Sequence, residues 1–331
     1  MIISRTPFRI SFFGGGTDYP IWYENHGGIV VSATINKYCF ITVRNLPPFF
    51  KYKHRIRYYQ HEETLTSNEI KHPSVRECIK FLSINKGLEI VHSADLPAQS
   101  GLGSSSTFTV GLLNALHALQ NYMPTKRELA LEAIHVEQNL IGESVGSQDQ
   151  TAAAFGGLNK ISFDKVRNFE VKPVIVSEKR LFELQNNLML FFTGFARTAS
   201  IIAKKQIEVT PQKESELNMM VEVCNESLAL LTDNRKPIEE FGKLLNEQWK
   251  IKRSITNKIS NTDIDAIYLA GIKAGALGGK LLGAGGGGFM LFYVPKGKQN
   301  SVKKALKSKL FVPFRFEFTG SKIIYYSHPG I

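Results

Sequence analysis

Apolar and polar residues alternate along the first part of the chain. The segments 9–13, 28–35, 38–43 and 55–59 are rich in β-branched and aromatic residues, and turn-forming residues separate them. Alternation with a period of two is typical of strands that bury one face. The pattern therefore predicts that the chain begins with a β-rich layer.

A helical period follows further along the chain. Apolar residues lie on one stripe over 108–119, which predicts a buried helix. Thr125 and Glu128 have the spacing of a capping box, which predicts that a second helix covers 126–141. Further helices are expected over 74–85, 199–231, 237–259, 262–276 and 296–309, the last with Val302, Leu306 and Leu310 on one face. Further strands are expected over 88–95, 156–163, 187–193, 289–294, 314–318 and 322–327.

The order of these elements indicates the fold class. Helices and strands mix irregularly and do not alternate strictly, so we expect an α+β fold. A polar hairpin near 164–168 is the predicted boundary between two domains, 1–170 and 171–331.

Composition indicates the kind of cellular compartment in which the protein is expected. The cysteines Cys39, Cys78 and Cys224 are far apart and odd in number, which predicts reduced thiols and no zinc site. No apolar stretch is long enough to cross a membrane, and the N-terminus is predicted to be a strand and not a signal peptide. We therefore expect a cytoplasmic protein that does not bind membranes, with no prediction of its oligomeric state.

The net charge of +12 favours anionic partners. The densest basic cluster, 49–59, interleaves aromatic residues, a pattern that can bind nucleic acid. It also alternates as a strand with one solvated face does, and we favour this second interpretation. The anionic partner is then expected to be a small ligand and not a nucleic acid.

Three glycine-rich segments carry the candidate chemistry, at 14–16, 101–106 and 283–288. In the second, two glycines precede three serines at the start of the helix over 108–119. Glycines let backbone N–H groups turn toward a ligand, and a helix N-terminus attracts anions. One serine is enough to cap a helix. The segment therefore predicts a polyphosphate site.

Two common nucleotide motifs are absent. No lysine follows the second segment, so it is not a Walker A loop. The third segment contains Gly283, Gly285 and Gly288 in G-x-G-x-x-G spacing, but a helix precedes it and a strand follows, the reverse of a dinucleotide fingerprint. We expect a helix-to-strand turn whose extra glycines allow close approach of a ligand.

Phosphoryl transfer needs carboxylates near the phosphates. Asp149 stands among small residues in G-S-Q-D-Q-T-A-A-A, which favours a functional role. On spacing alone Glu137 is predicted to be a solvated helix residue, whereas Asp18 fits an Asx turn and a functional site equally well. Arg197, beside Thr198 and Ser200 at a predicted helix start, is either a phosphate ligand or a solvated side chain next to an N-cap.

Taken together, the segments R-T-P-F-R-I-S-F-F-G-G-G-T-D-Y, P-A-Q-S-G-L-G-S-S-S and K-L-L-G-A-G-G-G-G-F resemble, in order, three motifs of the GHMP small-molecule kinases. The resemblance spans nearly the whole chain. It implies a two-domain α+β fold in which ATP and substrate bind between an N-terminal ATP-binding domain and a C-terminal domain. ATP and Mg²⁺ are the implied cofactors.

The resemblance also implies roles for individual residues. Asp149 corresponds to the catalytic aspartate, and Arg9 to a basic residue that acidifies the acceptor hydroxyl. Ser105 and Glu137 correspond to the magnesium ligands. The implied ATP-binding residues are Pro97, Ser100, Gly101, Leu102, Gly103, Ser104, Ser105 and Ser106. The implied substrate-binding residues are Gly15, Gly16, Thr17, Asp18, Gly285 and Gly286, to which we add Arg197 as our own inference.

Within this family, the first motif and G-S-Q-D-Q-T-A-A-A-F-G-G look most like those of bacterial kinases of D-glycero-D-manno-heptose 7-phosphate. Such a kinase phosphorylates the anomeric C1 hydroxyl and forms a 1,7-bisphosphate for nucleotide-activated heptose. The alternatives are another sugar 1-kinase of fucose or galactose type, and a sugar- or ATP-binding regulator without turnover.

Overall fold

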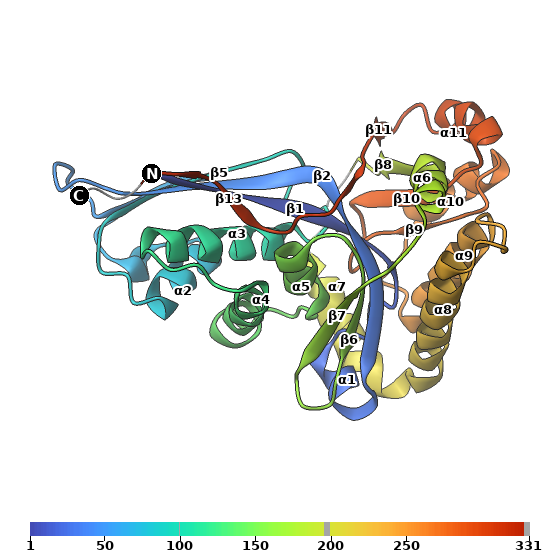
Figure 1. Ribbon diagram of the computed structural model, residues 1–331, viewed down its shortest axis with the longest axis horizontal. Coiled ribbons are helices and arrows are strands. Elements are labelled where there is room, and N and C mark those ends of the chain that lie inside the picture. The colour runs from blue at the N-terminus through green and yellow to red at the C-terminus, as the bar shows by residue number, and fades with distance from the viewer. Residues whose placement is uncertain (99, 195–198, 328–331) are drawn as a thin grey trace.

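The computed structural model describes residues 1–98, 100–194 and 199–327. Within these ranges the chain forms two β-sheets, a large one of nine strands and a smaller one of four. Figure 1 shows helices packed under the large sheet and a second group of helices around the small sheet. This mixture confirms the expected α+β class.

The large sheet is built on two long strands, β1 (Ile2–Phe13) and β2 (Gly28–Asn45). They pair antiparallel along nearly their whole length. The two strands expected at 28–35 and 38–43 are one continuous strand. Its pairing with β1 is irregular between Pro7 and Arg9, and there Ile35 pairs with Phe316 instead. The other strands of this sheet that lie before residue 200 are β3 (His54–Arg57), β4 (His61–Thr64), β5 (Leu88–Ala94), β6 (Leu158–Phe163) and β7 (Phe169–Pro173).

One helix forms the centre of the layer beneath the large sheet. Helix α3 (Ser104–Leu119) contacts both β1 and β2 and also packs on neighbouring helices. Every residue from Ser106 to Leu119 is buried, so the helix is buried on all sides and not along one stripe only. Gly111 makes this possible, since a Cβ there would lie 2.8 Å from Thr6 Oγ1 of β1. The helices around it are α2 (Pro73–Phe81), α4 (Lys126–His135) and α5 (Gln148–Phe155), and α1 (Pro20–His26) follows β1.

The small sheet has the strand order β11-β8-β10-β9. Its core is aromatic, with Phe191, Phe289 and Phe292 buried. Its strands are β8 (Leu188–Phe192), β9 (Gly278–Leu281), β10 (Phe289–Tyr293) and β11 (Leu310–Val312). The helices of this half are α6 (Glu178–Asn187), α7 (Ala199–Val209), α8 (Glu214–Thr232), α9 (Glu240–Ile255), α10 (Thr262–Lys273) and α11 (Gln299–Ala305).

The end of the chain returns to the large sheet. Strand β12 (Phe316–Glu317) pairs with β2, and β13 (Lys322–Tyr326) pairs with β1 as an edge strand. The late part of the chain therefore contributes to both sheets. The division at residue 170 stays a prediction.

Three expected helices differ in detail. The helix over 199–231 is two helices, because Pro211 cannot donate to the preceding turn and a short 3₁₀ segment, Thr210–Gln212, separates α7 from α8. The helix over 126–141 begins with the predicted capping box but continues beyond His135 as a π-helix, Val136–Ile141. The helix over 296–309 is only α11, preceded by a 3₁₀ turn, and Leu310 lies exposed in β11.

The basic cluster at 49–59 contains a strand, as expected, at β3. Arg55 Nη1 donates to Glu89 Oε1 at 3.1 Å and its guanidinium lies over the rings of Phe50 and Tyr52. Part of this positive charge is thus neutralised within the protein. In the ranges that the structure describes, no helix combines the length and apolarity that a membrane crossing requires.

Candidate active site

An ion pair joins the first strand to helix α5. Arg9 Nε donates to Asp149 Oδ1 at 2.7 Å and Arg9 Nη2 donates to Oδ2 at 2.6 Å. The paired hydrogen bonds fix both planar groups, since guanidinium and carboxylate match in geometry. Asp149 stands in the first turn of α5, where the helix dipole favours a carboxylate. Two residues 140 positions apart in the chain thus form one charged unit.

The same arginine holds the second glycine segment. Arg9 Nη1 donates to the carbonyl of Gly101 at 2.8 Å, and the backbone N–H of Arg9 donates to Leu102 O at 3.2 Å. Gly103 adopts a φ of +78°, and a Cβ there would lie 3.3 Å from Asp149 Oδ2. A residue with a side chain would be strained and would crowd the ion pair.

The three serines form the first turn of α3. Its N-cap residue is Gly103, with no side-chain cap, so none of the three serines serves as the cap. Ser106 Oγ instead donates to Glu137 Oε2 at 2.7 Å, and the Ser105 hydroxyl hydrogen-bonds Glu143. The structure thus brings Ser106, and not Ser105, to Glu137.

Glu137 is completely buried, so its interpretation as a solvated helix residue is wrong. The π-helix directs its side chain inward, where Gln150 Nε2 also donates to Oε2. Burial, reinforced by the nearby Glu143 carboxylate, raises the pKa of Glu137 to about 8. Its Oε1 atom is buried without a hydrogen-bond partner, which leaves an oxygen available to a ligand.

Glu143 was not among the predicted site residues. Burial raises the pKa of this carboxyl above its ordinary value. It lies in G-E-S-V-G, the same stretch of small residues that directed attention to Asp149. The small neighbours could have marked it as part of the site.

Asp18 marks the other end of the site, after the first glycine segment. Its Oδ1 accepts the backbone N–H of Gly16 at 2.8 Å. Gly146 packs so closely that a Cβ there would lie 1.9 Å from Asp18 Oδ2. Burial raises the pKa of the Asp18 carboxyl. Thr17 Oγ1 donates to the carbonyls of Gly14 and Ile29 and thereby stabilises the turn.

Two buried lysines from the second half of the chain also reach this end. Lys252 Nζ of α9 donates to Gly15 O at 2.8 Å. Lys280 Nζ of β9 donates to the carbonyls of Ser11 at 2.8 Å and Phe12 at 2.9 Å. Nothing local in the sequence distinguishes Lys252 from the other lysines of its helix, and we did not predict either residue.

The third glycine segment joins β9 to β10, which pair antiparallel, so the expected helix-to-strand turn is wrong. Its glycines allow two backbones to meet. A Cβ on Gly288 would lie 2.3 Å from Ser100 O, and one on Gly283 would lie 2.6 Å from the Cα of Gly101. Gly285 and Gly286 contact the backbone of Ile259.

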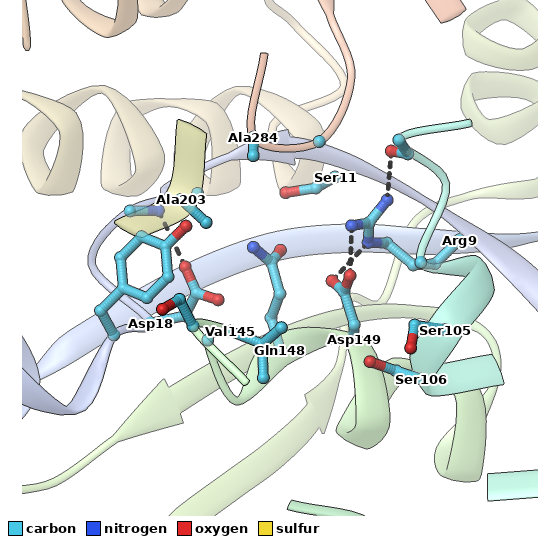
Figure 2. A pocket seen from close by; sticks show the side chains of 18 of the residues that line it. Arg9, Ser11, Asp18, Ser105, Ser106, Val145, Gln148, Asp149, Ala203 and Ala284 are labelled. Atoms are coloured by element: carbon cyan, nitrogen blue, oxygen red, sulfur yellow. Dashed lines mark hydrogen bonds and ion pairs between the residues drawn. The ribbon is translucent and has the colours of Figure 1, made fainter. Parts of the chain in front are cut away.

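These groups surround a cleft of about 360 Å³. Figure 2 shows Arg9 and Asp149 facing each other, with Ser105 and Ser106 on one side and Gln148 and Asp18 on the other. The predicted residues that line the cleft are Arg9, Gly15, Gly16, Asp18, Gly101, Gly103, Ser104, Ser105, Ser106 and Asp149. Ser100 and Leu102 are buried and do not line it, and Pro97 is exposed. Arg197 lies outside the described residues.

Two protein-family models match segments of the chain that contribute residues to this cleft. Residues 73–157 match the family model "GHMP kinases N terminal domain", and residues 227–312 match "GHMP kinases C terminal". The first match contains the serine loop and Asp149, and the second contains Lys252 and the third glycine segment.

Individual relatives agree over long stretches. The D-glycero-alpha-D-manno-heptose 7-phosphate kinase of Campylobacter jejuni is 29% identical over 96% of both chains. The mevalonate kinase of Thermococcus sibiricus is 30% identical over 70% of this chain and 68% of its own. The crystal structure of a D-glycero-D-manno-heptose 1-phosphate kinase from Bacteroides thetaiotaomicron aligns with a TM-score of 0.74 at 26% identity, over 99% of this chain and 100% of that one.

Proposed function

The chain belongs to the GHMP kinase family and is an ATP-dependent sugar kinase, and on this premise we propose its substrate and its catalytic residues. The proposed acceptor is the anomeric C1 hydroxyl of D-glycero-D-manno-heptose 7-phosphate. The product is the 1,7-bisphosphate, a precursor for nucleotide-activated heptose. The similarity to the Campylobacter jejuni kinase over nearly the full length supports this substrate.

The observation that carries the proposed chemistry is the Arg9–Asp149 pair. It lies between a serine-rich helix start and a buried aspartate, Asp18, and both ends face the same cleft (Figure 2). A phosphoryl donor at the first end and a sugar at the second would meet at this pair. The tight hydrogen bonding holds both groups in place before substrate binds, which lowers the cost of reorganisation during reaction.

The serine loop is the proposed site for the ATP phosphates. Its residues Gly101 and Gly103 have positive φ values of +77° and +78°. The loop leads directly into α3, a helix of 16 residues, whose N-terminal N–H groups have no intrahelical acceptor. Such a terminus favours negative charge.

In the proposed step, the C1 oxygen attacks the γ-phosphorus of ATP. The new O–P bond forms as the bond to the bridging oxygen breaks, and ADP leaves. Asp149 accepts the proton of the C1 hydroxyl, and Arg9 stabilises the negative charge that develops on that oxygen. The hydrogen bond from Arg9 Nη1 to Gly101 O links the Arg9–Asp149 ion pair to the serine loop, which would hold the ATP phosphates.

The residues at the serine end fit a magnesium ion. Ser105 and Glu137 are the proposed ligands, Ser106 and Glu143 adjoin them, and all four offer the oxygen atoms that Mg²⁺ prefers. Glu137 Oε1 is buried without a hydrogen-bond partner and could bind such an ion. When bound, the ion would neutralise charge on the transferring phosphates.

A kinase for a sugar without a phosphate is the second candidate, because galactokinase and fucokinases are also among the relatives. An ADP-release assay with ATP, Mg²⁺ and matched sugars distinguishes the two. We expect fast turnover of heptose 7-phosphate and slow turnover of heptose, galactose and fucose. Faster turnover of an unphosphorylated sugar would overturn the proposed substrate, and no turnover with any sugar would overturn the assigned catalytic residues.

A further inference from the structure

Lys252 and Lys280 have unused hydrogen-bonding capacity inside the cleft. Their side chains are 5% and 4% exposed, and both line the cavity. An ammonium group has three N–H donors. Lys252 uses one, on Gly15 O, and Lys280 uses two, on Ser11 O and Phe12 O. Three donors thus have no acceptor among the described residues.

The charge of the two lysines is only partly compensated, by Asp18. Neither forms an ion pair with a carboxylate in the part of the chain that the structure describes. Arg9 and Asp149 neutralise each other, which leaves two ammonium groups against Asp18 at this end of the cleft. Asp18 Oδ1 is already engaged with the N–H of Gly16. Buried charge without a partner is costly, so an anion bound here would stabilise the site.

Neighbouring polar atoms also lack partners. Ser11 Oγ and Gln148 Oε1 are buried without hydrogen-bond partners, and their side chains, 4% and 9% exposed, line the same cavity. The hydroxyls of a ligand could hydrogen-bond Ser11 Oγ and Gln148 Oε1, and an anionic group on the same ligand could accept hydrogen bonds from the two lysines. A sugar phosphate has this chemistry.

We propose that Lys252 and Lys280 form a subsite for a phosphoryl group carried by the sugar substrate, and that this subsite selects phosphorylated over neutral sugars. The proposal rests on the proposed function and assigns its specificity to two residues. ATP is the other source of a phosphoryl group. Lys252 contacts Gly15 and lies near Asp18. Asp18 lies on the far side of Asp149 from Ser105 and Ser106 (Figure 2), which favours the sugar.

The test replaces Lys252 by methionine, which keeps the length and removes the charge. Lys250→Met is the matched control, because Lys250 lies exposed on the same helix. With ATP saturating, we expect Lys252→Met to raise KM for heptose 7-phosphate about 10- to 100-fold, the value of a charge-assisted hydrogen bond. The KM values for unphosphorylated heptose and for ATP should change by less than about twofold.

Equal losses for both sugars, or a loss confined to ATP, would overturn the subsite while leaving the kinase assignment intact. Failure of the wild-type enzyme to phosphorylate either heptose would overturn the proposed function instead. The two failures are therefore distinguishable.

A binding measurement covers the case in which turnover is absent. Inorganic phosphate is titrated with ADP saturating, so that the nucleotide site is filled, and thermal stability is recorded. We expect phosphate to raise Tm of the wild type and of Lys250→Met but not of Lys252→Met. Equal stabilisation of all three proteins, or none of the wild type, would contradict the subsite. If Lys252→Met does not fold, competition in the wild type decides: phosphate should compete with the sugar phosphate and not with ATP.

Discussion

Gly101 lies so close to Leu282 that a Cβ on the glycine would be 2.4 Å from the Leu282 carbonyl oxygen. Gly101 of the serine loop and Leu282, which directly precedes the third glycine segment, are 181 positions apart and are in direct backbone contact. The loop cannot move away from the second half of the chain without breaking this contact. This relationship explains why both segments are glycine-rich at the same place.

Gly101→Ala should therefore destabilise the protein. The residue has a φ of +77°, which costs an alanine about 1–2 kcal/mol, and the clash with Leu282 adds to this. We expect a lower unfolding free energy in urea and a higher KM for ATP. Gly297→Ala is the control, because a Cβ at Gly297 has no atom within 4 Å. Equal stability of the two variants would show that the backbones do not meet here.

Asp149→Asn tests the proposed base. Asparagine keeps the size of the side chain but cannot accept the hydroxyl proton, so kcat should fall by about 10²- to 10⁴-fold. ATP affinity, measured by calorimetry, should change little, because the serine loop remains. Asp263→Asn, at an exposed position on α10, should leave kcat unchanged. A kcat for Asp149→Asn within about twofold of wild type would exclude this role.

Arg9→Lys tests the paired geometry of the ion pair. Lysine keeps the charge but cannot make two parallel bonds to Asp149 and a third to Gly101 O. We expect kcat to fall at least about tenfold while the KM values change less. Arg5→Lys, on the same strand and half-buried, is the matched control. Activity equal to the control would mean that charge alone is sufficient at position 9.

Glu137→Gln should change how stability depends on pH. The pKa of Glu137 is raised from 4.5 to about 8 by burial. Between these values the unfolded chain has lost this proton while the folded chain retains it. The carboxyl therefore makes the unfolding free energy fall as the pH rises through this window. Glutamine does not titrate, so we expect the variant to match the wild type below this window and to be more stable above it.

Urea unfolding without added magnesium, at about pH 4.5 and above about pH 8, measures this difference. Glu226→Gln serves as control, because Glu226 is exposed on α8. A constant difference between Glu137→Gln and wild type at both pH values would show that Glu137 does not titrate in this range.

Much of the local structure could be predicted from the sequence. The alternation over 9–13 and the apolar stripe over 108–119 correctly indicated β1 and α3, and Thr125 and Glu128 form the predicted capping box. These features depend on residues within a few positions of one another. Predictions of secondary structure were wrong where pairing with a strand outside the predicted segment decides the local conformation. The strand β2 is continuous because β1 pairs with it on both sides of an irregularity where Ile35 pairs with Phe316 instead. The third glycine segment is a hairpin because β9 pairs with β10.

The sequence by itself thus determined the α+β class, the three glycine motifs and the identity of Asp149 and Arg9 as candidates. Only the tertiary structure decided that Ser106 bonds Glu137 and that Lys252 enters the cleft. A serine in S-S-S or a lysine on a helix has no local feature that distinguishes it from its neighbours. Which of them reaches the site depends on the direction of each side chain after the sheets and helices pack, and packing is set by contacts between residues far apart in the chain.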